Sequence, residues 1–469
     1  YFGYNQRLSF TNTASYDLKI NGNSNLFIEG GNILQWDTNK YNYAYAYKGI
    51  NDFIKLNLLE SDRNNDNYLN PTAFPRQLVY KFLDRMSHNM VSFYGKGSYN
   101  YADKYTASLL LRYDASSHAQ PTSRWIFTPT LALGWNVKAT NLHDNDLFET
   151  FQVHASAGRL GIVNQFDNYS QGPNYSAQIG YTGNVIVPGY NGFAALTRPY
   201  QDGWIGYDVP WAFTDQANVG FDFQLKDHAI YFAIDAYIKQ NKNQLLAIPG
   251  AAEYGYNARY EAGMDVQNMG VDLIIGGDLL SSKNDGFRWN TSFNFGFNSN
   301  TLKALPNGLD EVVIGNRIFK VGERIDAFWL LENQGIYSDD SQVPMRNGQA
   351  MTYKGIALKA GDPIWNDSNN DHVINDQDKK MLGNIFPKVS GSWQHNFFYK
   401  NFDLKVNLYF NLGRNILNQE MANRFNFINN ENSANIEAIK EITYWEKRGD
   451  YSLYPLYNPW SSVQPYQAD

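Results

Sequence analysis

Oxygen-bearing side chains are concentrated in the stretch from Gly361 to Trp393, which reads GDPIWNDSNNDHVINDQDKKMLGNIFPKVSGSW. Side-chain oxygens at positions 1, 3, 5, 9 and 12 of a twelve-residue loop, with a backbone carbonyl at position 7, are the ligands of a calcium loop. The residues at those positions, in chain order, are Asp367, Asn369, Asp371, Val373, Asn375 and Asp378. The sequence therefore predicts a structural calcium site, and no other cofactor.

The same loop departs from the calcium pattern at two positions. His372 stands where the sharp turn prefers Gly, and Asp378 replaces the longer, usually bidentate Glu. A surface turn rich in Asn and Asp, held by hydrogen bonds from side chains to the backbone, explains the spacing equally well. The residues leave both interpretations open.

A second candidate site is the aromatic segment 162–215, which is also rich in Gly and Asn. Aromatic rings stack on sugars or on apolar peptide side chains, and Asn and Asp supply hydrogen bonds. The residues that we expect to bind substrate are Tyr175, Tyr190, Trp204, Tyr207 and Trp211. The alternative is a loop that packs on itself and uses its aromatic residues only as anchors.

Catalytic motifs are missing from the sequence. Its seven histidines lack the H-E-x-x-H spacing, and there is no G-x-S-x-G elbow and no phosphate-binding loop. Two carboxylates of a glycosidase need only be close in space, so abundant Asp and Glu give no evidence for or against that chemistry. We predict that the protein is not an enzyme.

The elements that position these loops are predicted by a period-two alternation of apolar and polar residues. Residues 91–101 and 105–114 alternate on both sides of a short turn, and 125–137 alternates from Trp125 to Trp135. Further alternating segments are 219–225, 230–238, 287–298 and 402–412. Strands of about ten residues exceed the usual five or six of soluble sheets and suit a tilted membrane-crossing strand.

Long irregular segments separate some of these strands. Segments 36–76 and 415–469 resemble the aromatic segment in character, and 430–444 has the apolar spacing of a short helix. Long loops at one end and short turns at the other are typical of an outer-membrane barrel. The polar face of the strands would then line a wet interior, with Lys96, Arg112, Asp114, Arg288, Asp403 and Lys405.

Composition agrees with strands that cross a membrane. Aromatic residues are 16% of the 469, yet mean hydropathy is −0.50, because a barrel wall needs apolar residues only at every second position. The sequence contains no run of about 18 apolar residues, so it predicts no membrane-spanning helix. The absence of Cys excludes disulfides, and a net charge of −7 argues against nucleic acid as a partner.

Three blocks of residues follow one another along the chain. The first comprises Arg112–Ser117, Arg124, Trp125, Pro129 and Leu133–Trp135. The second comprises Trp211, Asn218–Gly220, Asp235–Tyr237, Gln244–Leu246 and Val266–Val271. The third is the acidic loop followed by Gly383–Lys388 and an aromatic strand. In this order the blocks resemble the SusC-like (SusC/RagA) family of TonB-dependent outer-membrane transporters.

The resemblance implies an all-β fold, a transmembrane antiparallel β-barrel of 22 strands. By pattern we expect about 12 to 16 of those strands here, with long extracellular loops. Residues 1–469 would form part of one barrel domain, internal or C-terminal in a longer protein. The family's N-terminal plug and last C-terminal strands are expected to lie outside this sequence.

The implied function is TonB-dependent import of oligosaccharides or peptides across the outer membrane of a Gram-negative, Bacteroidota-type bacterium. The implied partners are a SusD-like surface lipoprotein, the TonB complex acting through the missing N-terminal region, membrane lipid and a glycan or peptide ligand. A transport-inactive barrel that serves as a scaffold in a larger outer-membrane assembly is one alternative. A secreted carbohydrate-active β-protein is another.

Overall fold

The computed structural model describes most of the chain. The described ranges are 2–47, 78–162, 172–173, 177–178, 181–182, 185–186, 195–196, 204–207, 209–226, 230–251, 253, 258–280, 286–418, 444–450, 452 and 454–456. Within them no helix has the length and apolar character needed to cross a membrane. The predicted helix at 430–444 and the candidate residues Tyr175 and Tyr190 fall outside these ranges, apart from Tyr444.

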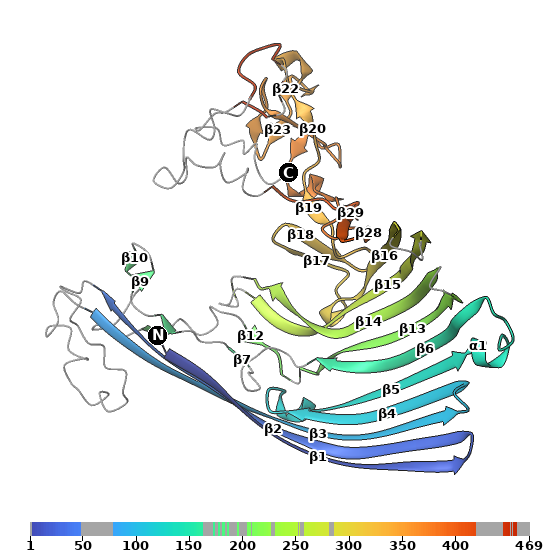
Figure 1. Ribbon diagram of the computed structural model, residues 1–469. Helices are drawn as coiled ribbons and strands as arrows, with labels where there is room; N and C mark the ends of the chain where they lie inside the picture. The colour runs from blue at the N-terminus through green and yellow to red at the C-terminus, as the bar shows by residue number, and fades with distance from the viewer. Residues whose placement is uncertain are drawn as a thin grey trace. The chain divides into compact units, whose positions relative to one another are not determined.

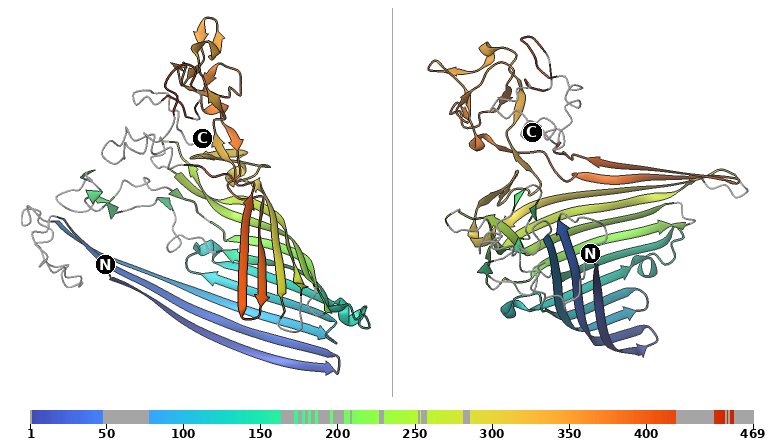
Figure 2. Two further views of the ribbon diagram at one scale, coloured as in Figure 1. Left: turned by 45° about the horizontal axis from the view of Figure 1, so that its top comes forward. Right: turned by 90° about the vertical axis from the view of Figure 1, so that its left-hand side faces the viewer.

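Twelve long strands follow one another in a single curved sheet (Figures 1 and 2). Neighbours on this path are antiparallel wherever their register is resolved. In sheet order the strands are β1 (Phe2–Asn21), β2 (Ser24–Tyr47), β3 (Leu78–Tyr101), β4 (Tyr105–Ser116), β5 (Trp125–Asn136), β6 (Phe148–Ile162), β13 (Ala212–Leu225), β14 (Tyr231–Pro249), β15 (Ala258–Leu280), β16 (Arg288–Ala304), β28 (Val389–Tyr399) and β29 (Phe402–Leu412).

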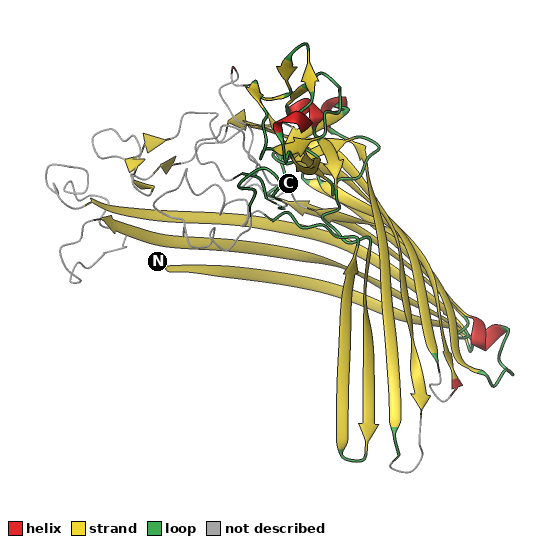
Figure 3. Ribbon diagram, turned by 90° about the horizontal axis from the view of Figure 1, so that it is seen from above, coloured by secondary structure: helices red, strands yellow, loops and turns green. Residues whose placement is uncertain are grey.

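The connections 117–124 and 250–257 join strands at one end of the sheet, and the other short connections join strands at the opposite end. The latter include the turn 22–23 between β1 and β2, the turn 102–104 between β3 and β4, and the segment 137–147, which holds the helix α1 (Val137–Thr140) (Figure 3). The longest connections, 48–77, 163–211 and 305–388, leave from the same end as 117–124 and 250–257. In a membrane barrel the end that has only short turns faces the periplasm.

The two faces of the sheet differ as the alternation predicts. On β4 the exposed residues Tyr105, Leu109 and Leu111 share one face, and Arg112 and Asp114 lie on the other. The exposed apolar row continues onto β5, because the register places Tyr105 opposite Trp135 and Leu109 opposite Leu131. One face is therefore apolar over neighbouring strands, as a lipid-facing wall requires.

The width of this apolar face matches a membrane. Trp125 and Trp135 mark its two edges on β5, ten residues apart, which is about 33 Å along an extended strand. With the usual tilt of about 40°, that distance corresponds to about 25 Å across the bilayer. Trp125 stacks on Tyr113 with ring centroids 4.7 Å apart, so aromatic rings gather at this edge as a girdle does.

Most strands predicted by alternation are confirmed, and some expectations are wrong. The strands β4, β5 and β29 lie where predicted, and the predicted 91–101 and nearly all of 287–298 are strand, but β3 begins 13 residues earlier, at Leu78, and β16 ends six residues later, at Ala304. β13 and β14 extend well beyond the predicted 219–225 and 230–238. The expectation of a loop from residue 36 onwards is wrong as far as Tyr47, because β2 continues to that residue in register with β3.

Contacts divide the chain into two compact units. The sheet unit comprises Tyr1–Asp310 and Ser392–Leu408, and the loop unit comprises Glu311–Gly391 and Tyr409–Asp469. The prediction that all 469 residues belong to one barrel domain stays a prediction.

The loop unit contains short strand pairs around a core of its own. Its strands are β17 (Glu311–Ile314), β18 (Arg317–Lys320), β19 (Phe328–Leu330), β20 (Asn333–Ile336), β21 (Met345–Arg346), β22 (Gln349–Ala350), β23 (Thr352–Tyr353), β24 (Ile356–Ala357), β25 (Pro363–Trp365), β26 (Val373–Ile374) and β27 (Lys380–Leu382). The buried core residues are Leu331, Tyr337, Val343, Met351, Tyr353, Leu358, Trp365 and Ile374. Such a core lets a long connection hold a defined structure.

Candidate functional site

The polar face of the sheet unit carries a network of side-chain hydrogen bonds. Arg112 donates from Nε to Asp114 at 2.7 Å and from Nη2 to Ser92 at 3.0 Å. By strand alternation, all six predicted lumen-facing residues lie on the face opposite the exposed aromatic rows. Because both faces of one sheet cannot meet lipid, this face suits the wet interior of a barrel.

His154 contacts two carboxylates on the next two strands of the sheet. Its Nε2 lies 2.7 Å from Asp235 and its Nδ1 lies 3.7 Å from Asp222, on strands β14 and β13. His154 and Asp235 meet across β13 because residue 220, which lies opposite both, is Gly. A Cβ atom there would approach Asp235 Oδ1 to 2.3 Å and His154 Nε2 to 2.7 Å.

Residues 204–211 dock on this polar face, with residue 208 not described; we name them the docked segment. Within it β12 (Trp204–Ile205) pairs in parallel with the start of β15 and antiparallel with β7 (Gly172–Pro173). Ile205 is only 1% exposed. Trp211 packs near Ile126 of the polar face of β5, because both meet the Cβ position of Gly161.

Gln120 clamps the docked segment to the connection between β4 and β5. Its side-chain nitrogen donates to the Gly206 carbonyl at 2.8 Å, and its side-chain oxygen accepts from the Val209 N–H at 2.7 Å. Gln120 is 4% exposed, so both bonds are shielded from water. The clamp joins residues that are 86 and 89 positions apart in the sequence.

The five aromatic residues predicted to bind substrate fall into three groups. Tyr175 and Tyr190 are outside the described residues. Trp204 and Tyr207 form an edge-to-face pair with centroids 6.1 Å apart, and Tyr207 is 62% exposed. Trp211 is 7% exposed and donates from its indole to the Arg124 carbonyl, so it anchors the segment here. The substrate contact of each residue stays a prediction.

We expect Gln120→Ala to loosen the docked segment. The substitution leaves the partly buried Gly206 carbonyl and the buried Val209 N–H without these partners, at a cost of about 1–3 kcal/mol for the buried group. Hydrogen exchange should accelerate at residues 205–209 and stay unchanged in β4 and β5. Gln152→Ala, on an exposed side chain of β6, is the control. Equal protection of residues 205–209 in both variants would contradict the clamp.

The acidic loop is closed by its own hydrogen bonds. Both oxygens of Asp367 accept backbone N–H groups, from Asp371 at 3.2 Å and His372 at 2.9 Å. Asp378 accepts from Ser368 at 2.9 Å and Asn375 at 2.8 Å. Among the described residues no group of three or more His, Cys, Asp or Glu side chains is arranged to hold a metal. A calcium ion would have to compete with these N–H groups for the carboxylate oxygens, and the calcium site stays a prediction.

Asp371→Ala separates the two interpretations of the loop. If calcium binds, the parent protein should hold calcium after dialysis and the variant should lose it, as measured by mass spectrometry of metals. Asn370→Ala is the control, because Asn370 is not among the six predicted ligands. Equal calcium content in the parent and the Asp371 variant would remove Asp371 from the ligand set.

Asp362 is the buried carboxyl of the loop unit for which we expect a pH effect. Burial raises the pKa of Asp362, although its Oδ2 accepts the Lys359 N–H at 2.9 Å, which acts in the opposite direction. A raised pKa in the folded state means that the folded protein binds the proton more tightly than the unfolded chain. This contribution to stability is complete below the unfolded pKa and is lost as pH rises through the folded pKa.

Asp362→Asn should therefore flatten the pH dependence of loop-unit stability. The measurement is hydrogen exchange of the core around Tyr337. In the parent protein, the protection factors should decrease as the pH rises from the pKa of Asp in the unfolded chain through the raised pKa of Asp362 in the folded protein. Asp376→Asn, on an exposed side chain, should keep the parent's profile. The idea fails if the Asp362 variant shows the parent's pH dependence.

Sequence patterns missed several residues of this site. Gln120 lies in a short connection, and nothing local signals that it bonds residues more than 80 positions away. His154 is one of the seven histidines without a metal-binding spacing, and its strand was not predicted because Gly158 and Gly161 obscure the alternation of β6. The alternating polar residues Gln152, His154 and Ser156 are the sequence pattern that indicates a strand with one polar face at this position.

Comparison with known proteins gives consistent matches along the chain. No protein-family model matches it. It is 26% identical over 426 residues to TonB-dependent receptor P3 of Formosa agariphila, covering 87% of this chain and 39% of that protein. It is 24% identical over 479 residues to TonB-dependent receptor SusC of Bacteroides thetaiotaomicron, covering 92% of this chain and 44% of that protein.

Solved structures agree on the fold. The RagAB peptide transporter matches with a TM-score of 0.71 at 17% identity, covering 97% of this chain and 47% of the other. The open-open state of the RagAB peptide importer matches with a TM-score of 0.70. The chain thus spans under half the length of these relatives. The predicted class, antiparallel strands of a transmembrane β-barrel, is confirmed.

Proposed function

We propose that this chain, which is a SusC-like outer-membrane protein and part of a TonB-dependent receptor barrel, serves the import of oligosaccharides or peptides. The observation that carries the proposal is the match over 87–92% of the chain to proteins named TonB-dependent receptors. One relative in fold is named a peptide transporter, which is why peptides stand beside oligosaccharides.

The geometry supports conduction of polar cargo through the barrel. The inner face is lined by ion pairs and hydrogen bonds, such as His154 with Asp235 and Arg112 with Asp114. These groups offer both donors and acceptors to a hydrated ligand. Trp204 and Tyr207 add aromatic surface, on which either a sugar or an apolar peptide side chain stacks.

Partners follow from the same proposal. Import would use a SusD-like surface lipoprotein and the TonB complex, which acts through parts of the receptor outside this chain. The loop unit has a packed core and many exposed polar side chains, so it is the part of the chain that we expect the lipoprotein to contact. No catalytic role is proposed, because the relatives are named as receptors and transporters.

The test is purification of the full-length protein from native membranes in detergent, followed by mass spectrometry of the intact complex. An importer should retain a SusD-like lipoprotein, a TonB-contacting N-terminal region and a bound glycan or peptide. Recovery with other envelope machinery, without that N-terminal region, would support the scaffold alternative. A detergent-free soluble monomer would overturn the proposal.

A further inference from the structure

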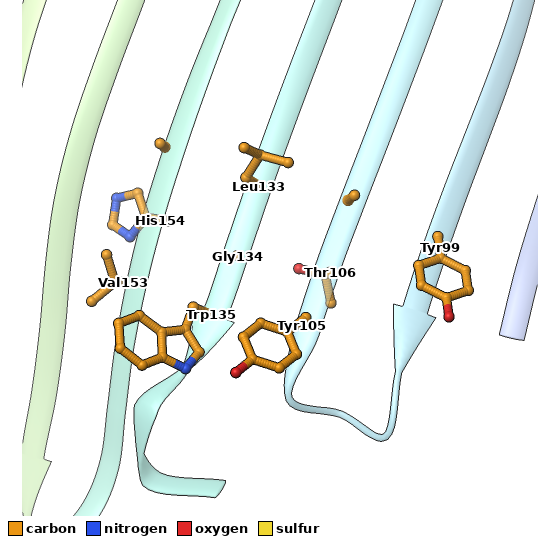
Figure 4. Close-up of a pocket in the computed structure, with 10 residues that line it drawn as sticks. Tyr99, Tyr105, Thr106, Leu133, Gly134, Trp135, Val153 and His154 are labelled. Carbon is orange, nitrogen blue, oxygen red and sulfur yellow. The ribbon is translucent and has the colours of Figure 1, made fainter. Parts of the chain in front are cut away.

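A groove of about 330 Å³ opens on the apolar face of the sheet unit, near the short turns. Outward side chains of four neighbouring strands line it: Tyr99, Tyr105, Ala107, Leu133, Trp135, Val153 and Ala155. Thr106, Gly134 and His154 also border it, at positions whose side chains alternate to the other face. Figure 4 shows the rings of Tyr99, Tyr105 and Trp135 near the turn ends of their strands, with Leu133 further along β5.

Strand register explains the hollow. One row across the sheet reads Tyr99, Ala107, Leu133 and Ala155, so two alanines lie between and beside larger residues. The next row toward the turns places Tyr105 opposite Trp135. Small side chains thus form the floor, and the rings form a wall at the turn end.

Two rings of the groove are held in place by hydrogen bonds. The Trp135 indole N–H donates to Thr140 Oγ1 of α1 at 2.9 Å. The Tyr99 hydroxyl donates to Ser24 Oγ at 3.2 Å. A preformed apolar hollow binds a ligand at a lower cost in side-chain ordering than a groove that must open.

The location of the groove selects its occupant. It is a depression in the face that contacts the hydrocarbon of the outer membrane, at the aromatic level beside the short periplasmic turns. An apolar trough in the lipid-facing wall has the chemistry to hold one acyl chain of a membrane lipid.

We propose that this groove seats one acyl chain of a phospholipid from the periplasmic leaflet. The occupant is a single bound lipid, distinct from the exchanging lipids around the rest of the barrel. The proposal concerns the wall of the barrel and holds whether or not the protein imports nutrients.

The test compares two substitutions on one strand and one face. Ala155→Phe fills the floor of the groove, whereas Ala157→Phe adds the same ring two residues along β6, on the same face but outside the lining. The full-length protein and both variants are purified in mild detergent, supplied with dioleoyl phosphatidylglycerol and examined by native mass spectrometry. Shifted mobility on unheated gels verifies that each barrel is folded.

The parent and Ala157→Phe should each retain one phospholipid after detergent activation, and Ala155→Phe should retain about fivefold less or none. Equal retention by the two Phe variants would overturn the proposal. So would a parent that holds no lipid, or that holds only lipopolysaccharide, which belongs to the opposite leaflet.

Discussion

Leu131→Arg should block or severely weaken assembly of the protein in the membrane. Leu131 is exposed on the apolar face, near the midpoint between Trp125 and Trp135 on β5. A lipid-facing Arg at the bilayer midplane costs about 2–4 kcal/mol, and the cost falls toward the interfaces. The measurement is the midpoint of urea unfolding in lipid vesicles, together with the amount of folded protein in isolated outer membranes.

The matched control for this experiment is the neighbouring residue. Ala132→Arg places the same charge on the polar face, where Ala132 lies opposite Ser108 and Ser156. It should assemble normally and lose little stability. If both variants are destabilised equally, the assignment of the two faces is wrong, and with it the register of β5 in the membrane.

Asp378→Ala should unfold the acidic loop. Asp378 is 0% exposed, and its two oxygens accept the backbone N–H groups of Ser368 and Asn375. Its own carbonyl accepts the Ser368 hydroxyl at 2.9 Å, which completes the closure. Removing a buried charged acceptor of two hydrogen bonds costs about 3 kcal/mol. Hydrogen exchange should lose protection across 367–378 and in the core around Ile374.

Asp376→Ala is the control for that variant. Asp376 lies two residues away, with its side chain 73% exposed and one ion pair, to Lys379 at 3.2 Å. It should leave exchange of the loop unchanged, because exposed ion pairs contribute little. Repeating both measurements with a chelator tests calcium: hydrogen bonding alone predicts no change in the parent. Full protection in the Asp378 variant would contradict the closure.

Much of the fold could be predicted from short stretches of sequence, because each strand of the barrel wall has its own alternation of apolar and polar residues. The alternation in 105–114 predicts both a strand and the direction of each side chain, and the structure bears this out in β4. β2 was missed because Gly30 and Asn32 interrupt its apolar face. Its pairing with β3 over 24 residues stabilises a strand that its own residues only weakly favour.

The site was harder to predict than the fold, since its contacts join distant residues. Trp211 stands in an aromatic segment like Tyr207, yet one is buried and the other exposed. That difference arises from Gln120, Gly161 and Arg124, which lie elsewhere in the chain. The groove likewise depends on how four strands align, which no single strand encodes.

Cysteine labelling along β5 tests most directly that this sheet crosses the membrane with a wet inner face. The chain contains no Cys, so single substitutions give a clean background. In cells or vesicles, a membrane-impermeant maleimide should label Thr130→Cys and Ala132→Cys from the lumen and should not label Leu131→Cys or Leu133→Cys. Equal labelling at all four positions, or labelling only at 131 and 133, would contradict the barrel wall described above.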